Sequence, residues 1–330
     1  MKAGKVSEQI LKRTILKQLN SKNSNVVLSS AVGEDCSRLR SDNKDIIFSV
    51  NPITIPLEVE DMGKHGIYRA FNNISAKGAT PVAALVSLLM PTSSNEQDAR
   101  TIIKGLDAAA SKLGVQVIGG HTECCRGVNV PIITITGVGL AERDIDMKTS
   151  NVEPGMDIIA TNWVGMEGTL VLLNQKREEL LQHFTNPFLD KISVFEQYLS
   201  INEEAKIACN NNAATIHDIS EGGIFAALWE LAEGSKVGLE IDSRKIPIKQ
   251  ETIEVCEFFD INPYKIASMG SALIAAKDGN TIVHEIEKAG GHATIIGKAT
   301  DNNDRVLLIG EEKRFLETPQ TDELRKVLTY

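Results

Sequence analysis

The 330-residue sequence has little of what marks several classes of protein. Its five cysteines are an odd number and form no C-x-x-C pair, which argues against a disulfide framework and against a zinc site. No apolar run approaches bilayer-spanning length and no signal-peptide core follows the first residues, so we expect a cytoplasmic protein without a membrane partner. A net charge of -9 leaves no basic stripe, which argues against a nucleic-acid partner.

Length and composition predict an ordinary globular chain with two domains. The sequence exceeds the usual size of one domain and is 42% hydrophobic and 24% charged. No internal repeat or low-complexity linker interrupts it, but a turn-forming stretch covers residues 151–156. We therefore expect one domain over residues 1–150 and a second over residues 151–330, packed together and of the α/β (α+β) class.

Apolar periodicity and turn residues predict strands and helices in both halves. Helices are expected over 7–19, 61–78, 96–113, 169–181, 191–199, 203–210, 251–259 and 281–289, with one more directly after residue 220. Strands are expected over 26–28, 46–50, 81–90, 115–118, 129–140, 157–160, 213–216, 237–241, 266–276, 292–296 and 306–309.

The segment HDISEGG, residues 217–223, gathers three ionisable side chains and two glycines between a short strand and a strongly patterned helix. Backbone N–H groups of glycines at a helix start approach an anion closely, and the helix terminus adds partial positive charge, so a phosphate fits there. Asp218 and Glu221 supply oxygen ligands of the kind Mg²⁺ takes, and His217 can reach a phosphate or hold a carboxylate. The same residues also fit a helix cap with Ser220 as N-cap and no ligand.

A second glycine pair, Gly119-Gly120, follows the fourth expected strand, with His121 and Glu123 beside it. The pattern resembles that of segment 217–223, with glycines at a strand end next to ionisable groups. A single histidine near a strand end is more often structural than catalytic, so only its neighbours make His121 a candidate.

Two further places in the first half carry unusual polar residues. Glu34 and Asp35 stand beside Gly33, which allows a backbone bend, although acid pairs in such turns are usually solvated. Asn72 and Asn73 fall inside the second expected helix, where their amides compete for backbone hydrogen bonds. We expect these two residues to be there for their side chains.

Five motifs occur in order along nearly the whole chain: Gly33-Glu34-Asp35-Cys36, Asn51-Pro52-Ile53-Thr54, NNISAKGATP at 72–81, Gly119-Gly120-His121-Thr122-Glu123, and segment 217–223. In that order they resemble the family of aminoimidazole ribonucleotide (AIR) synthetase, which also includes thiamine-monophosphate kinase, selenophosphate synthetase and the hydrogenase maturation protein HypE. Each motif is weak alone, and the five together are specific. The last one, continued to residue 233, looks most like HypE and the HypE-like AIR synthase-related proteins.

The resemblance implies a two-domain PurM-like fold and a homodimer, in which N-terminal domains pair to form a β-barrel and ATP and Mg²⁺ bind near the domain cleft. The chemistry shared by the family is ATP-dependent phosphorylation of an oxygen, or of selenide in one branch. In HypE the oxygen belongs to a carbamoylated C-terminal cysteine, which then becomes a nitrile. Phosphorylation activates this oxygen because phosphate leaves far more readily than oxide, and Mg²⁺ neutralises charge on the triphosphate.

Carried over residue by residue, the resemblance implies a site in two parts. The first domain supplies the residues expected to bind ATP, namely Gly33, Asp35, Asn51, Asn73, Gly119, Gly120, His121 and Glu123. Among them, the expected Mg²⁺ ligands are Asp35, Asn51 and Glu123. The second domain supplies the expected catalytic residues, which face the substrate: His217, Asp218 and Glu221.

Three departures from the family pattern bear on activity. Asn51 and Asn73 stand where family members usually have Asp, and each change keeps an oxygen ligand but removes a negative charge. Because Mg²⁺ shared with a triphosphate depends on carboxylates, we expect its affinity to fall. The third departure is the absence of a cysteine at or near Tyr330, so we expect no HypE-type reaction on the chain's own tail.

The first hypothesis is therefore a HypE-like, ATP-dependent enzyme that phosphorylates an oxygen of a small molecule or of a group borne by a partner, such as a maturation protein. The second is a catalytically weakened nucleotide-binding or partner-binding dimer of the same fold, suggested by Asn51 and Asn73. A third, the ring closure of AIR synthetase itself, is less favoured because segment 217–233 resembles HypE.

Overall fold

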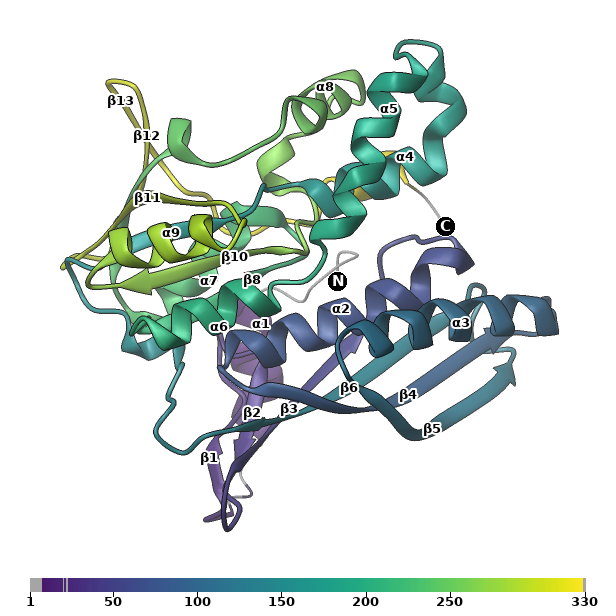
Figure 1. Cartoon of the computed structure of the whole chain (residues 1–330), viewed down its shortest axis with the longest axis horizontal. Helices are drawn as coiled ribbons and strands as arrows, with labels where there is room; N and C mark the ends of the chain where they lie inside the picture. Colours follow the sequence, from purple (N-terminus) through teal and green to yellow (C-terminus); the bar gives the residue numbers. More distant parts are fainter. Residues whose placement is uncertain (1–7, 20, 22, 329–330) are drawn as a thin grey trace.

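The structure of the chain, a computed structural model, describes residues 8–19, 21 and 23–328 and contains two β-sheets with helices packed around them. Figure 1 shows the N-terminal half, in purple to blue, on one side of the molecule and the C-terminal half, in green to yellow, on the other, with helix α2 between them. The expected mixed α/β class is confirmed. Among the residues just given, none of the helices combines the length and apolar character that a bilayer crossing requires.

The first sheet has six strands in the order β1-β2-β3-β6-β4-β5. Their bounds are β1 Val26–Leu28, β2 Cys36–Leu39, β3 Asp45–Pro52, β4 Thr80–Pro91, β5 Gln116–Cys125 and β6 Ile132–Ala141. Neighbouring strands are antiparallel except β4 and β5, which run parallel and are joined by the crossover helix α3 (Glu96–Lys112). Helices α2 (Val59–Ala76) and α3 cover one face of this sheet (Figure 1).

The opposite face of the first sheet is apolar and has no cover within the described chain. Side chains alternate between the two faces along a strand, so Ser49 of β3 points toward α2 and is buried, whereas Val50 points away and is 61% exposed. Thr136 of β6 pairs with Val50 of β3 on one side and with Leu85 of β4 on the other, so Leu85 lies on the same exposed face as Val50. Leu140 of β6 lies on this face too. An apolar face of this kind is a candidate interface.

The second sheet has seven strands in the order β13-β12-β9-β11-β7-β10-β8, antiparallel except for the parallel pair β9 and β12. The strands are β7 Asp157–Thr161, β8 Thr215–Ile219, β9 Gly238–Asp242, β10 Ser271–Ala276, β11 Ala293–Thr300, β12 Arg305–Ile309 and β13 Glu312–Phe315. The helices of this half are α4 Met166–Leu181, α5 Asn186–Ser193, α6 Asn202–Asn210, α7 Gly223–Ser235, α8 Gln250–Phe258, α9 Gly279–Lys288 and α10 Leu324–Val327.

Short helical segments complete the chain. The helix expected over 7–19 is a mixture of types: α1 Glu8–Ile10, a π-helix Leu11–Ile15 and a 3₁₀ turn Leu16–Gln18. Its first expected residue lies outside the described residues. Further 3₁₀ turns are Thr149–Asn151, Val194–Tyr198, Ser243–Lys245 and Pro263–Lys265.

Helix α2 is the central element of the molecule. It is buried along most of its length because the first sheet, α3 and the C-terminal half pack on different sides of it (Figure 1). One apolar core is continuous from Phe71 of α2 to Leu170 of α4. Gly63 lets α3 lie against α2, since a Cβ there would come within 2.0 Å of the Ile102 carbonyl oxygen. A helix surrounded in this way must pair any charged residue that it carries.

The expected elements are present, mostly with ends shifted by a few residues. Two strands, β2 and β13, and one helix, α10, were not predicted. Each is only four residues long, which is too short for a clear hydrophobic periodicity. The strand expected over 266–276 begins at Ser271. The expected Ser220 cap is wrong: α7 begins at Gly223, and its N-cap is Gly222 in the left-handed conformation with no side-chain cap.

Candidate functional site between the two halves

A line of four polar side chains runs along α2 and its C-terminal end. His65, Arg69, Asn73 and Lys77 are spaced four residues apart, which places them on one side of a helix, and we call them the polar stripe. All four are buried, so each needs a polar partner. The partners come from other parts of the chain and are Glu34, Glu167, Asp218 and Glu221.

Lys77, at one end of the polar stripe, pairs with Glu34. Its Nζ lies 2.7 Å from Glu34 Oε2 and donates to the Met147 carbonyl at 3.2 Å. The other Glu34 oxygen accepts a hydrogen bond of 2.8 Å from the Thr149 N–H. Glu34 is thereby a structural link, and of the two adjacent acids only Asp35 keeps a partly exposed side chain (37%) that can serve a site.

His217 of β8 lies between two carboxylates. Its Nδ1 is 3.7 Å from Asp35 Oδ2, and its Nε2 is 3.2 Å from Glu230 Oε2 on α7. Burial by itself would lower the pKa of His217, but the hydrogen bond to Glu230 and the charges of Asp35 and Asp218 outweigh it, and the pKa is raised. The imidazole at this place therefore holds its proton more firmly than an ordinary histidine does.

Asp218, the next residue of β8, meets an amide from the polar stripe. With the Asn73 amide in the orientation that satisfies its neighbours, its nitrogen donates to Asp218 Oδ2 at 2.8 Å. The Asn73 oxygen accepts from Ser49 Oγ and from Asn51 Nδ2, each at 3.0 Å. The structure thus brings Asn51, Asn73 and Asp218 together in one hydrogen-bonded group at the junction of the halves.

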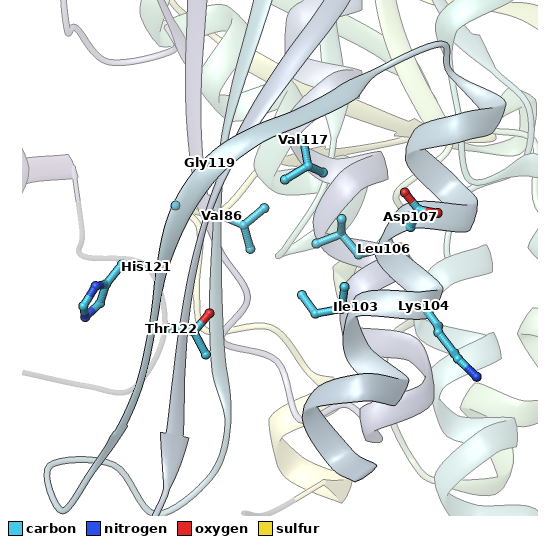
Figure 2. A pocket seen from close by; sticks show the side chains of 10 residues that line it. Val86, Ile103, Lys104, Leu106, Asp107, Val117, Gly119, His121 and Thr122 are labelled. Atoms are coloured by element: carbon cyan, nitrogen blue, oxygen red, sulfur yellow. The ribbon is translucent and has the colours of Figure 1, made fainter. Parts of the chain in front are cut away.

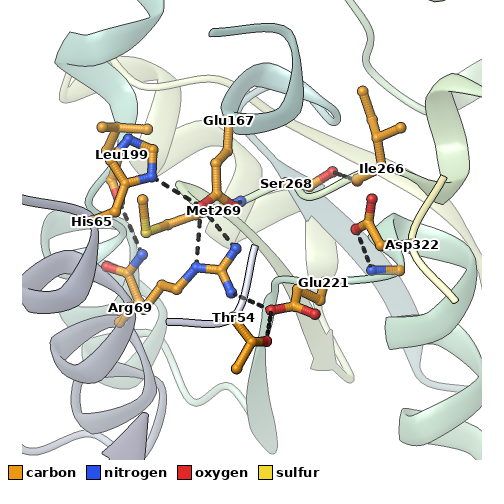
Figure 3. A network of polar contacts seen from close by, with 12 residues as sticks. Thr54, His65, Arg69, Glu167, Leu199, Glu221, Ile266, Ser268, Met269 and Asp322 are labelled. Atoms are coloured by element: carbon orange, nitrogen blue, oxygen red, sulfur yellow. Dashed lines mark hydrogen bonds and ion pairs between the residues drawn. The ribbon is translucent and has the colours of Figure 1, made fainter. Parts of the chain in front are cut away.

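Glu221, in the loop between β8 and α7, is held by three groups. Its Oε1 accepts from Arg69 Nη1 at 3.1 Å and from Thr54 Oγ1 at 3.3 Å, and its Oε2 lies 3.7 Å from Arg325 Nη2. Figure 3 shows Arg69 and Thr54 converging on this carboxylate. The side chain is 9% exposed, so Glu221 is an ion-paired carboxylate at the rim of the junction.

The chain itself supplies a carboxyl group at the start of α7. The Gly222 N–H donates to Asp322 Oδ2 at 2.8 Å, and the Leu324 N–H donates to Oδ1 at 2.9 Å. Burial raises the pKa of Asp322 to about 7, although both hydrogen bonds act to lower it. Gly223 is also needed for packing, since a Cβ there would lie 2.5 Å from the Tyr264 carbonyl oxygen. A phosphate approaching this glycine pair would meet a carboxylate already in place.

Glu167, at the start of α4, is the most deeply buried partner of the polar stripe. Its Oε1 accepts from Arg69 Nη2 at 2.8 Å and lies 3.1 Å from His65 Nδ1, and its Oε2 accepts from the Met269 N–H at 3.1 Å (Figure 3). Burial opposes ionisation of this carboxyl, but the Arg69 charge and the contacts with His65 outweigh it and hold the pKa at about 2. Glu167 is therefore charged and locked against α2.

The second glycine pair lies elsewhere and was misplaced at the sequence level. Gly119 and Gly120 are inside β5, not at the end of a strand, because β5 continues to residue 125. Gly120 lies opposite Val86 of β4, and a Cβ there would come within 1.8 Å of the Val86 carbonyl oxygen. Close approach of the two strands therefore accounts for this glycine.

β5 borders a hollow of about 490 Å³ between the edge of the first sheet and α3, lined by Ile103, Leu106 and Val117. Figure 2 shows His121 on the side of β5 that points away from α3. His121 Nε2 lies 3.1 Å from Glu123 Oε2, and both side chains are more than half exposed. These two residues form an exposed pair on an edge strand.

The three expected Mg²⁺ ligands are not assembled by a single chain. β5 is four strands from β2 in the first sheet, so about 19 Å separate Glu123 from the segment that carries Asp35. Among the described residues, no three His, Cys, Asp or Glu side chains gather as a metal-binding group. Asp35 and Asp218 still offer the carboxylate oxygens that Mg²⁺ prefers. The ligand set with Glu123 stays a prediction that requires a second copy of the chain.

The sequence reasoning missed Arg69, Glu167, His65 and Asp322. A signal for the first and third was present, since polar residues recur at every fourth position of α2 from His65 to Asn73. Glu167 carried a weaker signal, as an acid between two glycines at a helix start. Nothing in the local sequence around Asp322 points to the loop that it contacts.

Two mixed α/β halves meet along a buried line of polar side chains, and the candidate site lies at this junction. The family model of the N-terminal domain of AIR synthase related protein matches residues 33–141, and the model of the C-terminal domain matches residues 153–309. The chain belongs to this family.

Three curated relatives illustrate the range of the family. A putative hydrogenase expression/formation protein of Methanocaldococcus jannaschii is 28% identical over 98% of this chain and 97% of its own length. Carbamoyl dehydratase HypE of Rhizobium leguminosarum bv. viciae is 27% identical, covering 77% of this chain and 73% of the relative. Thiamine-monophosphate kinase of Pyrococcus horikoshii is 28% identical, covering 72% and 73%. The chain is thus similar to hydrogenase maturation proteins of the HypE type.

Solved structures show the same fold. A HypE–HypF complex contains a chain with a TM-score of 0.77 and 21% identity, covering 94% of this chain and 99% of that one. HypE in complex with ATP has a TM-score of 0.71 at 17% identity, covering 98% and 97%. AaThiL complexed with AMPPCP and TMP has a TM-score of 0.73 at 20% identity, covering 95% and 96%.

Proposed function

We propose that the chain is a HypE-like, ATP-dependent enzyme that phosphorylates an oxygen of a small molecule or of a group borne by a partner protein. The observation that carries this proposal is that Asp35, His217, Asp218 and Glu221 all lie along the buried junction between the two halves, the last two held by the polar stripe of α2. Related proteins of the same fold have been crystallised with ATP or with AMPPCP, and one with HypF, which supports a nucleotide and a maturation protein as partners here.

In this proposal the domain over residues 1–150 binds ATP and dimerises, and the domain over 151–330 presents the substrate. ATP would supply the phosphoryl group, and a bound Mg²⁺ would supply positive charge to offset that of the triphosphate. Asp35 would hold the cation. His217, whose pKa is raised, can donate a hydrogen bond to a phosphate oxygen, and Glu221 would orient the acceptor. The substrate oxygen bonds to the terminal phosphorus as the bond to ADP breaks.

The second candidate is a nucleotide-binding or partner-binding dimer with weakened chemistry. The contact between Asn73 and Asp218 favours it, because an amide donor satisfies this carboxylate without a cation. Two carboxylates at this distance would instead need a cation between them. The structure thus offers a physical reason for a metal site that works less well than one built from two acids.

Asp35→Ala tests the proposal. We expect wild-type protein to release phosphate from ATP in the presence of Mg²⁺. In the variant this rate should be lower by a factor of about ten or more, because a carboxylate ligand is removed. Turnover is measured by phosphate release and binding by isothermal titration. Asp42→Ala, an exposed acid of the turn before β3, is the control and should keep the wild-type rate.

Unchanged turnover in Asp35→Ala would remove the metal assignment. Wild-type protein that binds Mg²⁺ and ATP without turnover would favour the second candidate. Protein that binds neither would overturn both.

We also propose a homodimer formed through the uncovered face of the first sheet. That face exposes Val50, Leu85 and Leu140, an apolar patch that a second copy would cover. The edge strand β5 would then lie near the partner chain, which is the arrangement in which Glu123 could approach the Asp35 of the other copy.

A further inference from the structure

Arg69 is the one member of the polar stripe that contacts two carboxylates of the C-terminal half at once. Its Nε and Nη2 donate to Glu167 Oε1 at 3.1 and 2.8 Å, and its Nη1 donates to Glu221 Oε1 at 3.1 Å. Figure 3 shows the guanidinium between these two side chains. The two acids belong to different elements, the start of α4 and the loop before α7, so Arg69 joins both to α2.

Acidic side chains outnumber the basic ones around this guanidinium, so they depend on it for charge compensation. Three carboxylates lie near it, those of Glu167, Glu221 and Asp322, and the other cation contacting Glu221 is Arg325. Arg325 Nη2 lies 3.7 Å from Glu221 Oε2, farther than the 3.1 Å between Arg69 Nη1 and Glu221 Oε1. Removing Arg69 would therefore leave two nearly buried acids short of a partner, and a carboxylate in that situation moves toward water or takes up a proton.

Glu167 fixes Arg69 in turn. Its carboxylate is 0% exposed: Oε1 also lies 3.1 Å from His65 Nδ1, and Oε2 accepts from the Met269 N–H. Both bonds to Glu167 end on one oxygen, Oε1, which holds the Nε and Nη2 edge of the planar guanidinium against Glu167 and leaves Nη1 for the bond to Glu221. The place of the Glu221 carboxylate is thus determined by a buried pair that lies behind it.

We propose that Arg69 is a positioning residue for Glu221: it holds this carboxylate at the junction where the acceptor oxygen is bound. The proposal rests on the proposed function of Glu221. Because Arg69 and Asn73 are one helical turn apart on α2, the same helix sets the position of Glu221 through Arg69 and of Asp218 through Asn73.

Arg69→Lys is the informative variant, since lysine keeps the positive charge but cannot make three directed bonds. We expect amide hydrogen exchange in residues 219–224 to become at least about tenfold faster, and kcat for ATP turnover to fall by at least about tenfold with little change in the KM for ATP. The matched control is Arg38→Lys, because Arg38 is also buried and pairs with Asp45 at 2.7 Å but lies within the first half. The control should leave both readouts at wild-type values in folded protein.

Two results would overturn the proposal: wild-type exchange in residues 219–224 of Arg69→Lys, or an equal effect on those residues in Arg38→Lys. The exchange measurement needs no activity. If wild-type protein turns over no ATP, the proposed function fails, while faster exchange confined to 219–224 in Arg69→Lys still supports positioning.

Discussion

At residue 73, an amide donates a hydrogen bond to the Asp218 carboxylate, which an ionised carboxylate in the same place cannot do. Asn73 donates to Asp218 and accepts from Asn51 and Ser49, so Asp218 is the one ionisable side chain of this hydrogen-bonded group. Asp at position 73 would set two carboxylates against each other in a buried place, and one of them would need a proton or a cation. The sequence marked both asparagines as departures from the family pattern, and the structure shows what they do without a metal.

The double variant Asn51→Asp/Asn73→Asp should make the folded protein depend on Mg²⁺. In EDTA we expect a loss of about 2 kcal/mol or more of unfolding free energy, because buried like charges repel, and recovery on adding Mg²⁺. Thermal unfolding with and without Mg²⁺ measures this dependence. If the chain is the catalytically weakened dimer of the second candidate, ATP turnover of the double variant is expected to rise.

Asn72→Asp is the matched control. Asn72 donates to the Leu199 carbonyl at 2.9 Å and accepts from the Ile201 N–H at 3.1 Å, away from Asp218. It should lose stability to the same extent with or without Mg²⁺. A double variant equally unstable in both conditions would mean that these oxygens form no cation site.

At the scale of elements, α2 is the link between the halves, and the start of α4 is its strongest attachment. The Glu167 carboxyl is ionised in the folded state down to a pKa of about 2, against 4.5 for an ordinary glutamate. A pKa lowered on folding contributes stability that is complete above about 4.5 and is lost as the pH falls toward 2. This contribution is about 3 kcal/mol.

Glu167→Gln should therefore remove one component of the acid sensitivity of the protein. The difference in unfolding free energy between wild type and variant is expected to shrink by about 3 kcal/mol between pH 5 and pH 2. Urea unfolding at a series of pH values measures it. Glu179→Gln, an exposed acid of the same helix, should follow the wild-type curve. A constant difference across this range would show that Glu167 is not the ionised partner of Arg69.

At the scale of the whole molecule, helices cover only one face of the first sheet. Its α2 face is part of the continuous core, whereas on the other face Val50 is 61% exposed and Leu85 is 41% exposed within the described chain. Placing a carboxylate in the centre of such a face costs little in a monomer and several kcal/mol when a second copy covers it.

Leu85→Asp should accordingly separate a dimer into monomers. We expect wild-type protein to have twice the mass of the chain in light scattering coupled to size exclusion, and the variant to have the mass of one chain with unchanged helical content. Val194→Asp, an exposed apolar position of the C-terminal half, is the control and should remain dimeric. A monomeric wild type, or a dimeric Leu85→Asp, would contradict this interface.

The sequence by itself determined the α/β class, most helices and strands, and the motif that holds His217, Asp218 and Glu221. These are local properties: period, turn residues and spacing are written in neighbouring positions. The family, too, follows from motifs in a fixed order.

Only the tertiary structure decided which acids pair with which cations. Glu34 and Asp35 are adjacent, yet one is bound to Lys77 and the other faces His217. Arg69 and Glu167 are 98 residues apart and meet because α2 is enclosed by the second half. Burial and charge compensation act between segments that are distant in the chain, so no local pattern encodes them.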